Sequence, residues 1–205
     1  MKLHTLPEET HKALQSLNGF APLSDFYLSG GTALALHLGH RDSEDLDFFT
    51  QQQFNPENLH QKITSLGSIS SVYMEENTLN CYLNSVKLQF LYYPYKLLKE
   101  PIQWEGIKVS SVIDIACTKL ITISMRGSKK DFIDLYFILQ HYSLKELFAH
   151  AKKKYDTTDY NVPHIMKSLV YFNDAENQPM PRMHESISWE VIKSSIEKEV
   201  KNITF

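Results

Sequence analysis

Residues 26–49 read FYLSGGTALALHLGHRDSEDLDFF, and this stretch decides the fold. A β-rich run stops at Gly30 and Gly31, and the apolar run 32–38 predicts a short buried helix that begins soon after them. Residues 47–50 predict the next strand. The stretch therefore predicts a strand–turn–helix–strand unit with two glycines at its first turn.

The side chains of this unit indicate a chemistry. Glycine lets a ligand approach the backbone at Gly30 and Gly31, and a helix N-terminus offers free N–H groups to an anion. Thr32 can cap that helix or bond a phosphate oxygen. Asp45 and Asp47 are alternate residues of a predicted strand, so their carboxylates point to one face. Such a pair suits a divalent metal, above all Mg²⁺ shared with substrate phosphates.

Each part of the unit is a weak signal alone. Two adjacent glycines are most often a tight turn, and two alternate acids are most often a solvated strand edge. The order of the parts is more specific. A Gly-Gly pair after a strand, a short helix, and then Asp-x-Asp at the next strand is the pattern of the nucleotidyltransferase signature.

The rest of the chain divides into two regions. Residues 69–74, 79–83 and 86–93 predict an antiparallel meander, and 107–109 predicts one more strand. Helices are predicted over 7–17, 55–67, 112–126, 129–140, 143–155, 161–172 and 189–201, with a surface loop at 173–183. The predicted organisation is therefore an α/β core with an N-terminal helix, residues 1–109, and a helical region, residues 110–205.

The helical region carries a second group of charged residues. Lys119 and Arg126 share one helix face and could reach the phosphates of a nucleotide, while Asp131 and Asp134 share a face of the next helix. Spacing alone also permits ordinary solvated charges, with Lys130 and Asp134 as an i,i+4 pair. Both interpretations stay open at this point.

Charge and composition exclude several classes of protein. The net charge of −3, from 21 Lys+Arg and 24 Asp+Glu, excludes a generic polyanion binder, so any nucleic-acid contact needs a local patch. The run Lys152–Lys154 is either a solvated face or an RNA contact. Cys81 and Cys117 are too few for a disulfide framework and are expected as reduced, buried thiols. Neither a signal peptide nor an apolar membrane span is expected, which predicts a cytoplasmic protein without membrane contact.

Taken together, these residues resemble the AbiEii/AbiGii-type toxin family of nucleotidyltransferases, from abortive-infection and type IV toxin–antitoxin systems. The resemblance covers about Asp25 to Trp189. It is carried by Gly30, Gly31, Thr32 and Leu34–Leu36, by Arg41 and Ser43, by Asp45, Asp47, Phe48 and Phe49, by Lys119, Arg126 and the K-D-x-x-D of residues 130–134, and by Leu169–Pro181.

The resemblance implies a fold and an activity. The fold would be a polymerase-β-like mixed sheet whose cleft the helical region completes. The enzyme would use Mg²⁺ or Mn²⁺ to move an NMP from an NTP to an acceptor hydroxyl, with a tRNA end as acceptor and a cognate antitoxin as partner. The implied roles are catalytic for Asp45, Asp47, Lys119 and Asp131, metal-binding for Asp45 and Asp47, and nucleotide-binding for Gly30, Gly31, Thr32, Arg41, Ser43 and Arg126, with Asp134 as a further candidate.

The sequence departs from this pattern at the third carboxylate that such enzymes place on a neighbouring strand. The expected position is Gln89 or Lys87, and neither is acidic, although a Gln carbonyl can coordinate a metal. Glu75 and Glu76 fall in a predicted turn, and Asp131 is another replacement. Two other functions therefore stay open: a nucleotide- or partner-binding module that has lost catalysis, and a small-molecule nucleotidyltransferase of the aminoglycoside-modifying kind.

Overall fold

A seven-stranded mixed sheet forms the front half of the chain, in the order β3-β4-β5-β2-β1-β7-β6. The computed structural model describes residues 1–156 and 160–203. The strands are β1 Tyr27–Ser29, β2 Leu46–Thr50, β3 Ile69–Glu75, β4 Thr78–Leu83, β5 Val86–Tyr92, β6 Ile102–Trp104 and β7 Ile107–Val109. The α-helices are α1 Glu8–Ser16, α2 Gly30–Leu38, α3 Pro56–Ile63, α4 Val112–Met125, α5 Lys129–Ile138, α6 Leu144–Lys154, α7 Val162–Ser168, α8 Asn173–Glu176 and α9 Trp189–Asn202, and short 3₁₀ turns span Leu3–Thr5, Ala21–Asp25 and Thr64–Leu66.

The sheet confirms the predicted fold class and the predicted meander. β3, β4 and β5 are antiparallel neighbours. β2 runs antiparallel to β1 but parallel to β5, and β1 is parallel to β7, which makes the sheet mixed. The pairing of β2 with β5 brings the acidic stretch beside the meander.

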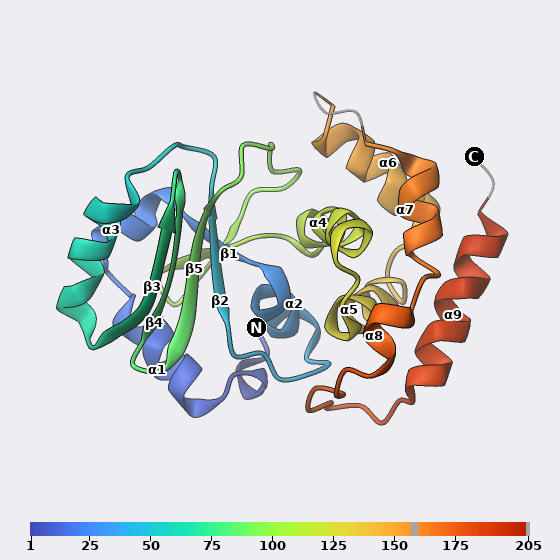
Figure 1. Cartoon of the computed structure of the whole chain (residues 1–205), viewed down its shortest axis with the longest axis horizontal. Coiled ribbons are helices and arrows are strands. Elements are labelled where there is room, and N and C mark those ends of the chain that lie inside the picture. The colour runs from blue at the N-terminus through green and yellow to red at the C-terminus, as the bar shows by residue number, and fades with distance from the viewer. Residues whose placement is uncertain (157–159, 204–205) are drawn as a thin grey trace.

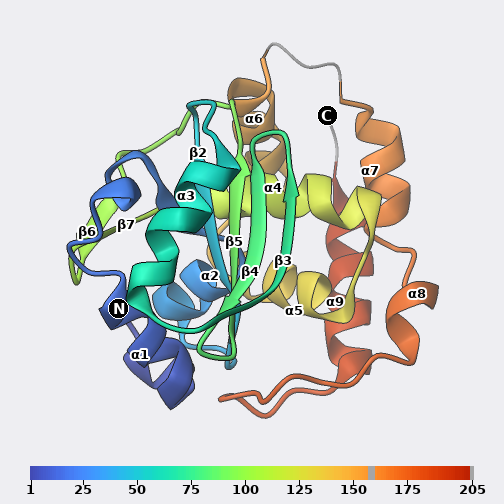
Figure 2. The ribbon, with the colours of Figure 1, turned by 60° about the vertical axis from the view of Figure 1, so that its left-hand side comes forward.

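Helices cover the two faces of the sheet differently (Figures 1 and 2). α1 and α3 pack on one face, against β3, β4 and β5. α2 packs on the other face, against β1 and β2, and separates the sheet from α4 and α5. Phe48 and Phe90 stack within the buried layer at 5.2 Å between ring centroids, and both are fully buried.

The last part of the chain folds back on α5. Trp189, at the start of α9, packs edge-on against Phe132 and Phe172 and donates from its indole N–H to Glu176 at 3.1 Å. Lys129 lies over the same indole ring, 5.0 Å from its centroid. The segment around α8 therefore holds α9 on the helical half. No helix of the described ranges is long and apolar enough to cross a membrane.

Several predicted boundaries are wrong. α2 begins at Gly30 rather than at Thr32, so both glycines belong to its first turn. The β-rich run before the glycines gives a strand of only three residues, Tyr27–Ser29, because Asp25 ends a 3₁₀ turn that begins at Ala21. Asp45 comes immediately before β2 instead of inside it.

Other elements were missed or shortened. β6 was not predicted, and α8 forms within the expected surface loop. The helix expected over 161–172 is shorter and ends at Ser168. The run Lys152–Lys154 was expected to be either a solvated face or an RNA contact, and Lys154 fits neither, because it is buried and pairs with Asp114 at 2.8 Å.

Candidate active site

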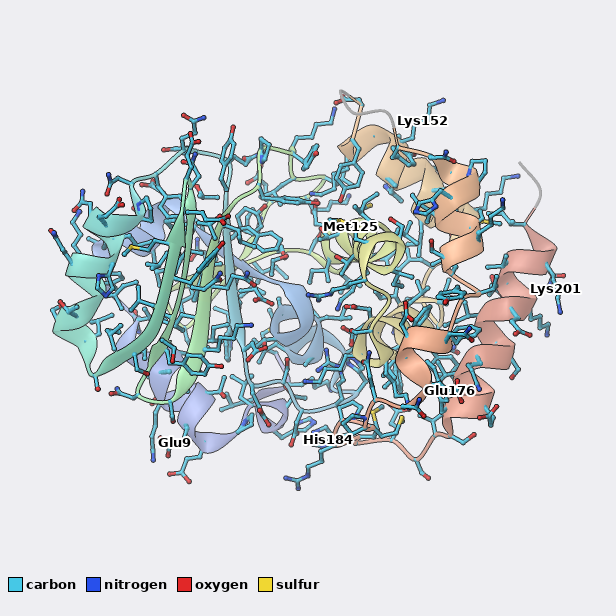
Figure 3. All side chains as sticks on the ribbon, viewed as in Figure 1. Glu9, Met125, Lys152, Glu176, His184 and Lys201 are labelled. Carbon is cyan, nitrogen blue, oxygen red and sulfur yellow. The ribbon has the colours of Figure 1, made fainter. Side chains whose placement is uncertain are left out.

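A cavity of about 400 Å³ lies between the sheet and α4. It has a polar side, where glycines, one carboxylate, one amide and two cations converge, and an apolar side. Figure 3 labels Met125, the last residue of α4. The lining residues are Gly30, Gly31, Asp47, Phe49, Gln89, Leu91, Ile115, Thr118, Lys119, Thr122, Met125 and Arg126.

Asp47 is the carboxylate that faces this cavity. Its neighbours in the sheet are Ser29 on β1 and Gln89 on β5. Its Oδ2 lies so close to Gly30 that a Cβ there would meet it at 2.2 Å, and Gly30 has a φ of +65°. The first glycine of the pair therefore makes room for the chain's own carboxylate.

Asp47 has no hydrogen bond or ion pair with any residue in the described ranges. It is half-buried, and burial raises the pKa of its carboxyl group, helped by the negative charge of Asp45. A partly buried carboxylate without a protein partner is costly unless a cation joins it. This observation fits a divalent metal at Asp47.

Asp45 is exposed, immediately before the same strand, and also lacks an ion pair among the described residues. Its backbone is anchored, because the buried Thr32 hydroxyl donates to the Asp45 carbonyl oxygen. The same hydroxyl lies 2.8 Å from Ser43 Oγ. Thr32 and Ser43, expected at the nucleotide, are thus placed beneath the cavity, where they support the turn that carries Asp45.

Arg41 is also placed behind the cavity. Its guanidinium donates to both oxygens of Asp134, from Nε at 2.7 Å and from Nη2 at 2.9 Å, and both side chains are buried. A Cβ at Gly31 would meet Arg41 Nη2 at 2.6 Å, so the second glycine makes room for this guanidinium. Arg41, Asp134 and His40, which contacts Asp134 Oδ1 through Nε2 at 2.8 Å, form a buried polar group.

Lys119 joins that group to the cavity. Its ammonium lies 2.8 Å from Asp131 Oδ1 and 2.5 Å from Asp134 Oδ2, and the residue also lines the cavity. Burial lowers the pKa of Lys119, but the charges of Asp134 and Asp131 outweigh burial, and the net direction is upward. Lys119 is therefore held as a cation, in a fixed position.

Asp131 is placed to hold cations rather than to face the cavity. It is buried, accepts from Lys119 and Arg126, and forms a capping box with Ser128 at the start of α5. Burial alone would raise the pKa of Asp131, but Lys119, Ser128 and Arg126 together lower it. With its oxygens committed to these donors, Asp131 does not fit the role of a replacement metal carboxylate.

Arg126 is the more accessible cation of the site. Its side chain is 68% exposed and lines the cavity, although its Nε also donates to Asp131 at 3.2 Å. The guanidinium keeps further N–H donors for a ligand.

Gln89 stands where the third carboxylate was expected. It lines the cavity directly beside Asp47. Glu75 and Glu76 line a different hollow, beside the end of β3, and Lys87 precedes Gln89 on the same strand face. Across 1–156 and 160–203, no group of three or more His, Cys, Asp or Glu side chains could by itself hold a metal.

Two residues of this arrangement, His40 and Ser128, were not identified from the sequence. His40 gave no readable signal, because its contact with Asp134 joins distant parts of the chain. Ser128 could have been found, since Ser128-Lys-Lys-Asp131 has the spacing of a capping box.

Glycines at a strand–helix turn, a carboxylate on the adjoining strand and cations on a facing helix define a nucleotidyltransferase. The chain matches, over residues 12–80 and 89–202, the family described as nucleotidyl transferase AbiEii toxin, type IV TA system. The chain belongs to this family of nucleotidyltransferase toxins. An uncharacterized protein of Aquifex aeolicus (strain VF5) is 38% identical over 207 residues, which cover 97% of this chain and 98% of that protein.

Solved structures share the fold. JHP933 from Helicobacter pylori superposes with a TM-score of 0.58 at 18% identity, covering 96% of this chain and 92% of that one. MenT4, a nucleotidyltransferase toxin from Mycobacterium tuberculosis H37Rv, gives 0.59 at 14% identity, covering 97% and 87%. At these identities the likeness shows the fold alone, and the family match carries the assignment.

Proposed function

We propose that this enzyme moves a nucleoside monophosphate from an NTP to the hydroxyl of a tRNA end, with Mg²⁺ or Mn²⁺. The observation that carries the proposal is that two buried acids near the cavity are paired with cations, whereas the half-buried Asp47 is not. Asp131 and Asp134 are neutralised by Lys119, Arg41 and Arg126, whereas Asp47 faces the cavity with no cation of the described chain paired to it.

The metal would be held by Asp47 and Asp45. Mg²⁺ commonly takes one or two protein carboxylates and completes its shell with water and substrate phosphates, so the lack of a third carboxylate is compatible with binding. Bound there, the ion would offset the negative charge of the reacting phosphates. The Gln89 carbonyl oxygen is a further candidate ligand, since it lies beside Asp47.

The remaining residues would bind and orient the triphosphate. The backbone N–H groups of Gly30 and Gly31 belong to the first turn of α2, which has no intrahelical acceptors for them, and they suit phosphate oxygens. Lys119 and Arg126 would offset charge on the leaving pyrophosphate. Thr32, Ser43, Arg41, Asp131 and Asp134 would position these groups.

The proposal extends to partners and to the division of the chain. A cognate antitoxin, as in other type IV systems, would oppose the activity. We retain the division into a 1–109 core and a 110–205 helical region that closes the cleft, supported by the lining of the cavity from both. The cytoplasmic location stays a prediction.

The test is label transfer. The purified protein is incubated with Mg²⁺, each labelled NTP and total tRNA, alongside Asp45→Ala and Asp47→Asn. We expect labelled tRNA with the unchanged protein and a loss of at least about 10²-fold in both variants, by analogy with the removal of one group that stabilises transition-state charge. Asp25→Asn, on the 3₁₀ turn outside this cavity, is the matched control. No transfer by the unchanged protein, or equal transfer by Asp45→Ala, would refute the proposal.

A binding module without catalysis is the second candidate, because Gln89 stands in place of an acid. Calorimetry showing NTP binding with no turnover on any acceptor would favour it. For a small-molecule enzyme acting on a cationic drug, the cavity should be acidic. Among the described residues that line it, Asp47 is the one carboxylate, against the cations Lys119 and Arg126. The lining therefore favours a polyanionic substrate.

A further inference from the structure

The sheet face that carries Asp47 continues beyond the cavity, across β5 and β4 to the edge strand β3. Side chains in register on neighbouring strands point to the same face. Asp47 pairs with Gln89, Gln89 with Asn80, and Asn80 with Tyr73, so one continuous row crosses four strands. On the same face, Tyr82 of β4 pairs with Lys87 of β5.

The outer part of this face is open. Tyr73 is 51% exposed and Tyr82 is 38% exposed, whereas the other face of β4 is buried at Leu79, Cys81 and Leu83. Figure 2 shows β3 and β4 lying at the front of the sheet with α4 behind them. Two exposed aromatic rings therefore lie on the sheet face that carries Asp47.

Two polar groups of this face, on Asn80 and Lys87, have no partner within the described ranges, whereas a third, the Tyr73 hydroxyl, is bonded. The Asn80 Oδ1 atom is buried and has no hydrogen-bond partner within the described ranges. Lys87 has no ion pair with a residue of those ranges, although it lies close enough to Asp47 to lower the pKa of that carboxyl. The Tyr73 hydroxyl donates to Glu75, which places an acidic group at the far end of the row.

We propose that Tyr73, Asn80, Tyr82 and Lys87 form a platform that binds the single-stranded end of the acceptor nucleic acid. Tyrosine rings stack on bases of any sequence, an amide bonds base edges, and a lysine contacts phosphate. The platform leads directly to Asp47, so an end stacked on it would deliver its terminal hydroxyl to the cavity. This inference rests on the proposed function, because it names how that site selects its acceptor.

The dimensions suit a few nucleotides. Neighbouring strands are about 4.8 Å apart, so the row from β2 to β3 spans about 14 Å, and stacked bases advance about 3.4 Å each. About four stacked nucleotides therefore fit between Asp47 and Tyr73. A duplex hides its base faces and could not stack on the rings. The chemistry thus favours an unpaired end over a helical stem.

The test measures binding apart from chemistry. Fluorescence anisotropy follows a short labelled single-stranded RNA on the unchanged protein, on Tyr73→Ala/Tyr82→Ala, and on Tyr73→Phe/Tyr82→Phe, which keeps both rings. We expect the alanine pair to weaken binding by at least roughly 25-fold, about fivefold for each lost ring, and the phenylalanine pair by less than about twofold. Tyr171→Ala is the matched control, since Tyr171 is 54% exposed but lies between α7 and α8.

Lys87→Gln should lower the salt dependence of RNA binding by about 0.7 in the slope of log K against log salt, as one lost phosphate contact. Binding of a blunt duplex should be at least about tenfold weaker than that of the single strand. Circular dichroism checks that the exposed substitutions leave the fold intact. Equal RNA binding by the alanine pair and the unchanged protein, or equal binding of duplex and single strand, would overturn the platform.

The transfer assay separates this inference from the proposed function. In the supporting case, the alanine pair raises KM for RNA while NTP binding, measured by calorimetry, is unchanged. If the alanine pair transfers label with an unaltered KM for RNA, the platform is refuted and the proposed function still stands. Specific loss of RNA binding in a protein that transfers no label would support the platform and refute the catalytic proposal. If single-stranded RNA does not bind at all, the face serves another partner, such as a protein strand added to β3, and the inference fails.

Discussion

Asp47 shows how the chemistry of this site depends on close packing at single residues. Its carboxylate rests against Gly30, pairs across the sheet with Gln89, and meets no cation of the described chain. Gly31 plays the corresponding part for the Arg41 guanidinium. The two glycines thus make room for two opposite charges, one facing the cavity and one behind it.

Substitution of Gly30 by alanine should abolish label transfer and also lower the free energy of unfolding. The new Cβ would meet Asp47 Oδ2 at 2.2 Å, and the φ of +65° is unfavourable for alanine. Gly19→Ala is the matched control, because Gly19 has a φ of +76° and no atom lies within 4 Å of the position that its Cβ would take. We expect both variants to lose roughly 1 kcal/mol from backbone strain, but only Gly30→Ala to displace Asp47 and lose transfer. Urea unfolding and label transfer measure the two effects, and full activity in Gly30→Ala would contradict the packing argument.

The pKa of Asp47 should depend on Asp45. Burial is the larger cause of the raised pKa and the charge of Asp45 is the next. Because the pKa is raised, Asp47 takes up a proton at a higher pH than a free aspartate does, and the proposed metal binding should weaken from that pH downward. Asp45→Asn removes one negative charge and should shift the titration of Asp47 to lower pH.

Carbon-13 NMR of labelled aspartate carboxyls in the metal-free protein follows this titration directly. Asp42→Asn is the control, since Asp42 is already paired with His184 and Arg182. An Asp47 titration that does not move in Asp45→Asn would show that burial alone sets its pKa.

Residue roles could be predicted from the sequence only where the contacts are local. The Gly-Gly turn, the Asp pair and Gln89 as the neighbour of Asp47 follow from strand and helix patterns. Arg41 and Asp134 could be selected as candidates, but not as partners. They are 93 positions apart along the chain, and no pattern in the sequence reports such a contact.

At the scale of elements, most strands and the long helices were predictable, whereas β6 and α8 were not. β3, β4 and β5 occur where alternating β-branched and aromatic residues predict them. β6 is three residues long and follows Pro101, so it carries too little pattern to be seen. α8 has four residues, and its Glu176 accepts from Trp189 and Lys193 of α9, a tertiary contact that no local pattern reports.

The packing of α9 on α5 depends on one indole ring. Trp189→Ala removes ring contacts to Phe132 and Phe172 and the ring under Lys129, and should destabilise the protein by roughly 3 kcal/mol. Val191→Ala, on an exposed position of the same helix, should change stability by less than about 0.5 kcal/mol. Urea unfolding followed by circular dichroism distinguishes the two. If Trp189→Ala and Val191→Ala were equally stable, the contacts of Trp189 with Phe132, Phe172 and Lys129 would not be what holds α9 on α5.

At the scale of the whole molecule, the placement of the charged side chains explains how a chain with a net charge of −3 could bind the proposed polyanionic substrate. Buried acids such as Asp131, Asp134 and Asp114 are paired with cations of the chain and project little field. Lys87 and Arg126 remain beside the cavity. The proposed affinity for RNA would therefore depend on a few local contacts rather than on the total field.

The two predicted regions should unfold together. One hydrophobic core contains buried residues of both, and His40 and Arg41 of the front half bond Asp134 of the helical half.

Each half also carries one tryptophan, Trp104 in β6 and Trp189 in α9. In Trp189→Phe, the fluorescence of Trp104 reports on the sheet, while far-UV circular dichroism reports mainly on the helices. If the halves separated, Asp134 would lose His40 and Arg41, its partners in the front half, and breaking a buried charge pair is strongly destabilising. We therefore expect the two probes to give the same urea midpoint. Trp104→Phe, in which Trp189 reports on the helical half, provides the reciprocal measurement. Separate midpoints in either variant would show that residues 1–109 and 110–205 are independent folding units.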